Sequence, residues 1–146
     1  MEETIFGADS MYRHAADFVR RLVPGEAAIV VGLQGDLGAG KTTFFQGVAQ
    51  ALGVREHTTS PTFVIQKSYK LSGQPFHNLI HIDAYRLKEA HELEVLGWHD
   101  IVKDPHNLIF IEWPERVSGI LPKNAVILKF RFIDEQTRGV ERVTGV

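Results

Sequence analysis

The segment from Gly35 to Thr43, GDLGAGKTT, constrains the fold of this chain more than any other feature of its sequence. Its spacing, G-x-x-x-x-G-K-T, is that of a loop whose backbone amides surround the phosphates of a nucleoside triphosphate. Such a loop needs a strand before it and a helix after it. The nearly all-apolar run AAIVVGL at 27–33 is typical of a strand buried on both faces, and residues 41–52, closed by Gly53, supply the helix. The segment therefore predicts an α/β fold of the P-loop NTPase type.

Hydrophobic periodicity elsewhere in the chain predicts further helices and strands around this unit. Asp9 and Ser10 are typical of a helix N-cap and precede apolar residues at helical spacing. We expect one domain over residues 1–146, with flanking helices and a mixed sheet that is parallel near the loop and antiparallel elsewhere. The expected elements are a helix at 11–22, a loop at 54–62, a hairpin of strands at 63–71 and 76–83, a helix at 89–96, and strands at 108–111 and 125–132, the last pairing with residues from about 140.

The composition narrows the class of protein. Of the 146 residues, 44% are hydrophobic and 23% are charged, which is typical of a globular protein rather than a disordered one. The absence of cysteine excludes disulfides and thiolate metal sites. A net charge of −2 without a block of Lys and Arg argues against a nucleic-acid binder that acts alone. The sequence shows neither a signal-peptide pattern nor an apolar run long enough to cross a bilayer, so we expect a cytoplasmic protein without a membrane partner.

The residues of the loop each have a distinct use in holding phosphate. Glycines such as Gly38 and Gly40, on either side of Ala39, let successive backbone N–H groups point inward without a clash of Cβ atoms. Lys41 supplies a full positive charge near the β- and γ-phosphates, and Thr42 supplies a hydroxyl to Mg²⁺. The sequence therefore predicts a site for a nucleoside triphosphate with Mg²⁺.

Two carboxylates are candidates for the acidic partner of the metal ion. Asp83 ends one apolar run and Glu112 ends another, as expected of an acid at the end of a buried strand. Either acid could be an ordinary surface residue; the sequence does not decide which one lies on the metal side. His81 lies on the same strand face as Asp83 and either positions a water or Asp83, or is a buried, hydrogen-bonded histidine. No segment fits the N/T-K-x-D pattern with which GTPases read guanine, which favours ATP.

Four segments in this order resemble the bacterial TsaE family, the ATPase of tRNA threonylcarbamoyladenosine biosynthesis. They are GDLGAGKTTF at 35–44, SPTF at 60–63, HIDAYRL at 81–87 and IEWPER at 111–116. The resemblance implies a small P-loop α/β fold that binds ATP with Mg²⁺ and hydrolyses it weakly alone. It also implies a partner, the TsaB–TsaD pair, which moves a threonylcarbamoyl group onto an adenosine of tRNA. The chain would then act on tRNA only indirectly, through this complex.

The resemblance also implies roles for individual residues, carried over by position. The residues expected to carry the chemistry are Lys41, the metal-side Glu112 and a second essential acid, Asp83. The other implied positions, at the phosphates, the metal or the nucleotide, are Gly38, Gly40, Thr42 and Thr43 in the loop, Ser60 and Thr62 in a segment that resembles a switch, the aromatic Trp113, Ser10 near the N-terminus and Arg138 near the C-terminus.

Two other functions fit a phosphate loop. A small-molecule kinase would need an acceptor pocket and usually an Arg-rich lid, and no such insertion is obvious in the sequence. A nucleotide-dependent switch would bind ATP without hydrolysing it. If the chain is an ATPase, as the resemblance implies, we expect slow hydrolysis by the isolated protein and stimulation by a partner. The reason is that no spacing in the sequence fixes one of the candidates Arg86, Arg116 and Arg138 on the γ-phosphate.

Overall fold

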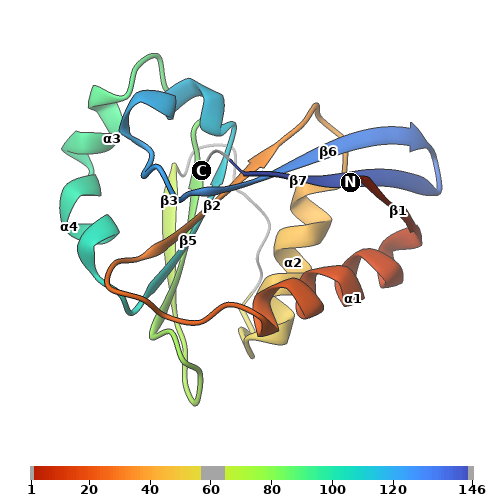
Figure 1. Ribbon diagram of the computed structural model, residues 1–146, viewed down its shortest axis with the longest axis horizontal. Coiled ribbons are helices and arrows are strands. Elements are labelled where there is room, and N and C mark those ends of the chain that lie inside the picture. The colour runs from red at the N-terminus through yellow and green to blue at the C-terminus, as the bar shows by residue number, and fades with distance from the viewer. Residues whose placement is uncertain (1, 57–64, 145–146) are drawn as a thin grey trace.

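Seven strands form one mixed sheet in the computed structural model, which describes residues 2–56 and 65–144 (Figure 1). The sheet order is β1-β7-β6-β2-β5-β4-β3. The strands are β1 (Glu2–Phe6), β2 (Ile29–Gln34), β3 (Gln66–Lys70), β4 (Asn78–Asp83), β5 (Asn107–Glu112), β6 (Val126–Asp134) and β7 (Thr137–Thr144).

The centre of the sheet is parallel and its margins are antiparallel. Strand β2 pairs in parallel with β5 and β6, and β5 pairs in parallel with β4. Strand β3 is antiparallel to β4, as are β7 to β6 and β1 to β7. Because the carboxyl ends of parallel strands meet at one edge, the ends of β2, β4 and β5 lie together. The predicted mixed α/β sheet with flanking helices is confirmed.

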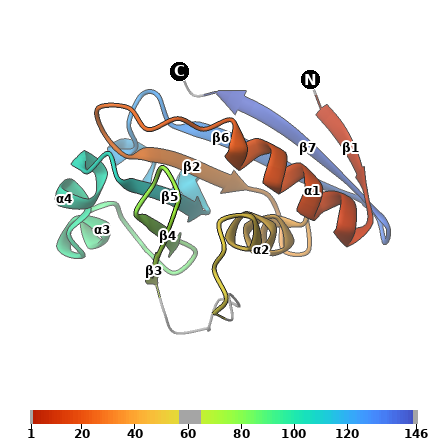
Figure 2. The ribbon, with the colours of Figure 1, turned by 90° about the horizontal axis from the view of Figure 1, so that it is seen from below.

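Helices cover both faces of the sheet (Figures 1 and 2). Helices α1 (Gly7–Arg20) and α2 (Lys41–Ala51) pack on one face and on each other. The opposite face carries the short helices α3 (His91–Val95) and α4 (Trp98–Lys103) and the 3₁₀ helix η1 (Pro114–Ile120).

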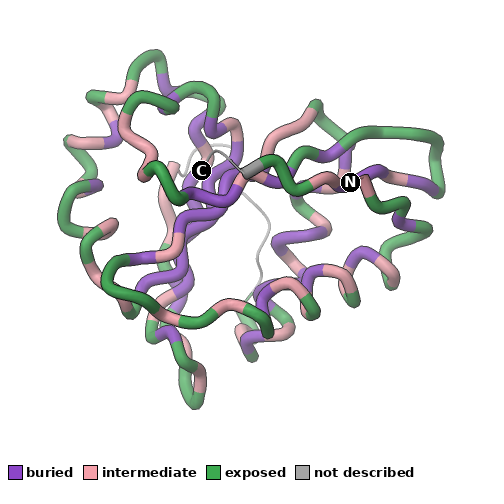
Figure 3. Tube along the Cα trace, viewed as in Figure 1, coloured by how far each residue is buried: buried purple, intermediate pink, exposed green. Residues whose placement is uncertain are grey.

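The apolar strands are buried on both sides, as Figure 3 shows along the middle of the molecule. In β5, Leu108 and Phe110 join the core beneath α1 and α2, where Phe44 packs against Phe110 with 6.4 Å between ring centroids. Ile109 and Ile111 point to the other face and join the second core. This double burial explains why the run is apolar at every position instead of alternating.

The first helix begins earlier than the sequence predicts. Asp9 and Ser10 lie inside α1, so their predicted N-cap role is wrong; the N-cap is Phe6, whose side chain makes no capping hydrogen bond. The physical reason is the unpredicted strand β1, which leads directly into the helix. The Gly7 amide donates to the Gln136 carbonyl oxygen at 2.8 Å, so the neighbouring β6–β7 turn holds the helix start.

Other differences concern short elements and strand ends. Helices α4 and η1 were not predicted, and β7 begins at Thr137, earlier than the predicted position near 140. The predicted strand at 63–71 corresponds to β3, while its first two residues and most of the predicted loop at 54–62 lie outside the described residues. Among residues 2–56 and 65–144, no helix combines the length and the apolar character needed to span a bilayer.

Candidate functional site

The glycine-rich loop connects β2 to α2 and lies against the middle of β6. At Gly35, an added Cβ would come within 2.5 Å of the Phe130 carbonyl oxygen, so only glycine allows this close approach. Gly40 has φ +106° and is the N-cap of α2, a left-handed conformation that favours glycine. The loop therefore turns sharply and presents the first amides of an eleven-residue helix to the space above it.

That space is a cavity of about 490 Å³ at the loop. Its volume is within the range of ~300–1,000 Å³ usual for small-molecule sites. The loop lies on one side, and the start of α1 and the β6–β7 turn lie on the other. The lining residues are Leu37, Gly38, Gly40, Lys41, Thr42, Thr43 and Glu112, with Gly7, Ala8 and Met11 from α1, Glu135 and Gln136 from the turn, and Arg138 from β7.

Lys41 is a buried cation without a hydrogen-bond acceptor in the described part of the chain. The residue is only 4% exposed, and Nζ has no hydrogen-bond partner among the described residues. Nζ lies 3.9 Å from the centroid of the Trp113 ring. Burial lowers the pKa of Lys41, against the opposing attraction of acids that include Glu112 and Asp83. A buried ammonium that lacks an acceptor beside a cavity is suited to an anionic ligand, and a polyphosphate fits.

The two predicted acids are neighbours at the carboxyl edge of the sheet. Asp83 and Glu112 occupy paired positions of the parallel strands β4 and β5. Glu112 is buried, and its Oε2 lies 2.7 Å from Nε2 of His81. Asp83 is half-buried, and its Oδ1 accepts a hydrogen bond from the Tyr85 amide at 3.0 Å. Of the two predicted uses of His81, the structure has the buried, hydrogen-bonded histidine, and its partner is Glu112 rather than Asp83.

The donor set suits a magnesium ion shared with phosphate. In the described part of the chain, no group of three or more His, Asp or Glu side chains could hold a metal ion by itself. Mg²⁺ is commonly held by one or two carboxylates, waters and the phosphates of a substrate. Thr42 and Glu112 both line the cavity, which agrees with that kind of site.

Trp113 follows Glu112 in an unusual backbone conformation. Its φ of +59° is the single positive value of a non-glycine residue in the described chain. The ring contacts Lys41, as above, and Tyr85, with 5.1 Å between centroids. Arg116 in turn lies over the Tyr85 ring at 5.4 Å. The aromatic that was predicted near the nucleotide therefore contacts the ammonium of the phosphate loop.

Arg138, from β7, also contacts the glycine-rich loop. Its Nε donates to the Gly38 carbonyl oxygen at 2.9 Å, and its Nη1 donates to the Thr137 carbonyl oxygen at 3.0 Å. Ser10, the other predicted terminal contact, lies outside the cavity lining, and its Oγ accepts from Arg13 at 3.0 Å. Ser60 and Thr62 lie outside the described residues. The sequence missed Gly7, Ala8, Met11, Glu135 and Gln136, which no motif marks.

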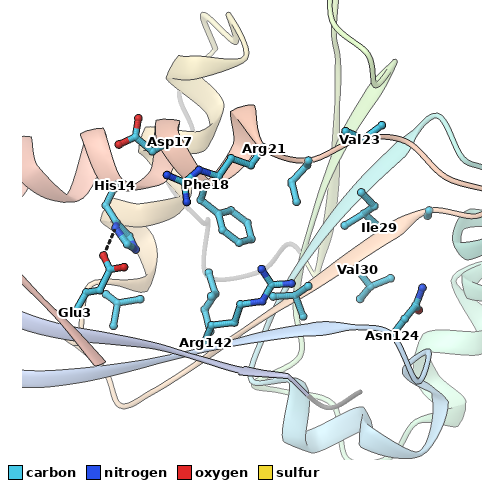
Figure 4. Close-up of a pocket in the computed structure, with 15 residues that line it drawn as sticks. Glu3, His14, Asp17, Phe18, Arg21, Val23, Ile29, Val30, Asn124 and Arg142 are labelled. Atoms are coloured by element: carbon cyan, nitrogen blue, oxygen red, sulfur yellow. Dashed lines mark ion pairs between the residues drawn. The ribbon is translucent and has the colours of Figure 1, made fainter. Parts of the chain in front are cut away.

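A second cavity, of about 520 Å³, lies between α1 and strands β2, β6 and β7 (Figure 4). Phe18 lies on its helix side, and Glu3 pairs with His14 at 3.2 Å. Its charged lining is balanced, since it includes Arg21 and Arg142 as well as Glu3 and Asp17. No residue of this cavity lines the phosphate-loop cavity, so it is not where the predicted chemistry would take place.

Known proteins resemble this chain in fold and in sequence. The crystal structure of YdiB from Bacillus subtilis superposes with a TM-score of 0.75 at 24% identity, covering all of this chain and 86% of that one, which supports the fold. A protein of Haemophilus influenzae, named tRNA threonylcarbamoyladenosine biosynthesis protein TsaE, is 35% identical over 92% of this chain and 83% of its own length. A protein of the same name from B. subtilis is 36% identical over 77% of this chain and 67% of its own length.

The family model described as threonylcarbamoyl adenosine biosynthesis protein TsaE matches residues 7–142. This match includes the glycine-rich loop, both acids and Arg138. The chain therefore belongs to the TsaE family.

Proposed function

We propose that this protein is a Mg²⁺-dependent ATPase that supports threonylcarbamoyladenosine modification of tRNA as part of a multi-protein complex with a TsaB–TsaD pair. The observation that carries the ATP part is the buried Lys41 ammonium, which has no hydrogen-bond acceptor among the described residues and lines a cavity beside the glycine-rich loop. The tRNA part rests on the family, whose curated members carry that pathway in their names.

In this proposal the glycine-rich loop and the ends of β4 and β5 have different roles. Backbone amides of the loop and Lys41 bind the phosphates, and the Thr42 hydroxyl and Glu112 hold the ion. Mg²⁺, when bound, neutralises charge on the phosphates. Asp83 contributes to hydrolysis at least as much as to binding. Lys41 already lies close to Trp113, so phosphate binding replaces or shares a contact that the free protein makes with an aromatic ring.

We expect slow hydrolysis by the isolated chain, because two of its three candidate arginines make other contacts. The guanidinium of Arg138 donates to backbone carbonyls, and that of Arg116 lies over Tyr85. A stabilising arginine is worth about 10³–10⁵ in rate in GTPases. A partner that supplies or orders such a group would therefore raise the rate strongly.

Calorimetry with ATP, with and without Mg²⁺, tests the binding roles. We expect Glu112→Ala to weaken the dependence of ATP binding on Mg²⁺, and Asp83→Ala to reduce hydrolysis at least as much as binding. If only Asp83→Ala alters the Mg²⁺ dependence, the two acids have been assigned in the wrong order.

Phosphate release, measured for the protein alone and with the TsaB–TsaD pair, tests the functional role. We expect slow release alone and marked stimulation by the pair, with Lys41→Ala as the control for contaminating activity. Fast release alone that the pair leaves unchanged contradicts the proposal. Phosphate transferred to a small acceptor would indicate a kinase, and partner binding that responds to ATP without any turnover would indicate a switch.

A further inference from the structure

His81 contacts Glu112 in a buried setting that the motifs do not explain. Both side chains are 9% exposed, and Nε2 of His81 lies 2.7 Å from Oε2 of Glu112. When Glu112 is ionised, as a metal ligand is, its carboxylate only accepts hydrogen bonds, and Nε2 of His81 then carries the hydrogen and donates it. The two residues come from adjacent parallel strands, where His81 is paired with Phe110, two positions before Glu112.

The imidazole is itself held in place from the side of α2. Its ring lies 4.4 Å from that of Phe45, centroid to centroid, at an angle of 39°. Phe45 is fully buried and also packs edge-on against Phe110. The histidine is therefore oriented by the core, and its donor is directed at a single oxygen of Glu112.

We infer that His81 is a positioning residue for Glu112: it fixes one carboxylate oxygen, so that the other is presented in a constant direction to the metal side of the phosphate-loop cavity. This inference rests on the proposed function. Asp83 is held separately, by the Tyr85 amide. Loss of the His81 donor should therefore change the Mg²⁺ dependence of ATP binding, which relies on Glu112. The contribution of Asp83 should stay the same.

The magnitude follows from the behaviour of such supporting contacts in other metal sites, where removing one typically costs about 10–100-fold in metal affinity or activity. A merely structural role for His81 would instead lower stability and ATP affinity together, with and without Mg²⁺. The two roles are separable because the hydrogen bond and the ring contact can be removed independently.

Three variants make that separation. His81→Gln places an amide N–H three bonds from Cβ, as far along the side chain as Nε2 of histidine, but lacks the ring. His81→Met has a similar length without a donor. His81→Phe keeps a ring against Phe45 without a donor. The Gln and Met variants lose the ring equally, so they remain a matched pair even if His81→Phe does not fold.

The measurement is ATP binding by calorimetry over a series of Mg²⁺ concentrations, with thermal melting to compare folding. We expect His81→Phe and His81→Met to raise the half-saturating Mg²⁺ concentration about 10–100-fold, with Mg²⁺-free ATP affinity unchanged and His81→Gln close to wild type. In Glu112→Ala, adding His81→Met should cause no further change. In metal-free protein, NMR should show a slowly exchanging His81 Nε2–H that Glu112→Ala abolishes.

Two results would overturn the inference. If the Gln and Met variants have the same Mg²⁺ requirement, the donor has no role. If Mg²⁺-free affinity falls by the same factor as Mg²⁺-bound affinity, His81 acts on the fold alone. A wild-type protein whose ATP binding does not respond to Mg²⁺ would instead refute the proposed function, and the inference with it.

Discussion

Replacing Lys41 by methionine is expected to move stability and ATP affinity in opposite directions. Methionine has nearly the length of lysine and no charge, so it can fill the same buried space beside Trp113. Without ATP, the ammonium of Lys41 is a buried donor without an acceptor among the described residues. In the proposed complex with ATP, the same ammonium would be the charge that the loop directs at the β- and γ-phosphates.

The magnitudes follow from this environment. A buried, unsatisfied donor costs about 1–3 kcal/mol, and more when it is charged. The contact with Trp113 returns about 0.5–2 kcal/mol, and nearby carboxylates add to this. A net gain of about 1 kcal/mol on removing the charge corresponds to a rise of about 2–4 °C in melting temperature. The lost hydrogen bond to phosphate, about 1.5–3 kcal/mol, corresponds to roughly 10–100-fold weaker ATP binding.

Thermal melting in the absence of nucleotide and calorimetry with Mg²⁺ and ATP measure the two effects on the same sample. Lys70→Met, at an exposed position of β3, is the matched control and should change neither. A lower melting temperature for Lys41→Met would show that attraction to Trp113 and the acids outweighs the cost of burial. Unchanged ATP affinity would refute the phosphate-binding role of Lys41.

Two further predictions concern packing and charge. Gly47→Ala should destabilise the protein by about 1–3 kcal/mol in urea unfolding, because the new Cβ would lie 2.9 Å from Cβ of Ala15 where α1 meets α2. The control is Gly119→Ala, which has open space around its Cβ and should have little effect. Equal losses of stability in the two variants would contradict this reasoning. The hydrogen bond from Arg131 lowers the pKa of Glu2. This pair therefore stabilises the fold fully at pH values above the ordinary carboxyl pKa of about 4.3, and the stabilisation is lost as the pH falls through the lowered pKa. Glu2→Gln should therefore lower the melting temperature at neutral pH but not in strong acid, and a difference that is the same at every pH would refute it.

The phosphate loop and the two acids could be predicted because their signals are local. The glycine spacing requires a strand before it and a helix after it, and apolar runs that end in Asp83 and Glu112 indicate buried strands. Parallel pairing then brings their ends to one edge. The residue types and their positions next to apolar runs were sufficient to predict these residues as a site, without knowledge of the register between strands.

The rest of the site depends on contacts between distant segments. The wall of the cavity at Gly7 and Gln136 exists because β1 pairs with β7, at opposite ends of the chain. The contact of His81 with Glu112 depends on strand register, which one sequence does not fix. The left-handed backbone of Trp113 has no sequence signal either, because an aromatic residue rarely adopts it.

The bracing of the loop from β6 and β7 has a consequence for how the protein is made. Gly35 lies against Phe130, and Gly38 accepts a hydrogen bond from Arg138, which is 100 residues further along the chain. During translation the glycine-rich loop leaves the ribosome long before these supports, and β2 must wait for both of its neighbours, β5 and β6. A nascent chain thus carries the complete glycine-rich motif without the structure that shapes it, and a ligand of this loop can assist folding only after synthesis is nearly finished.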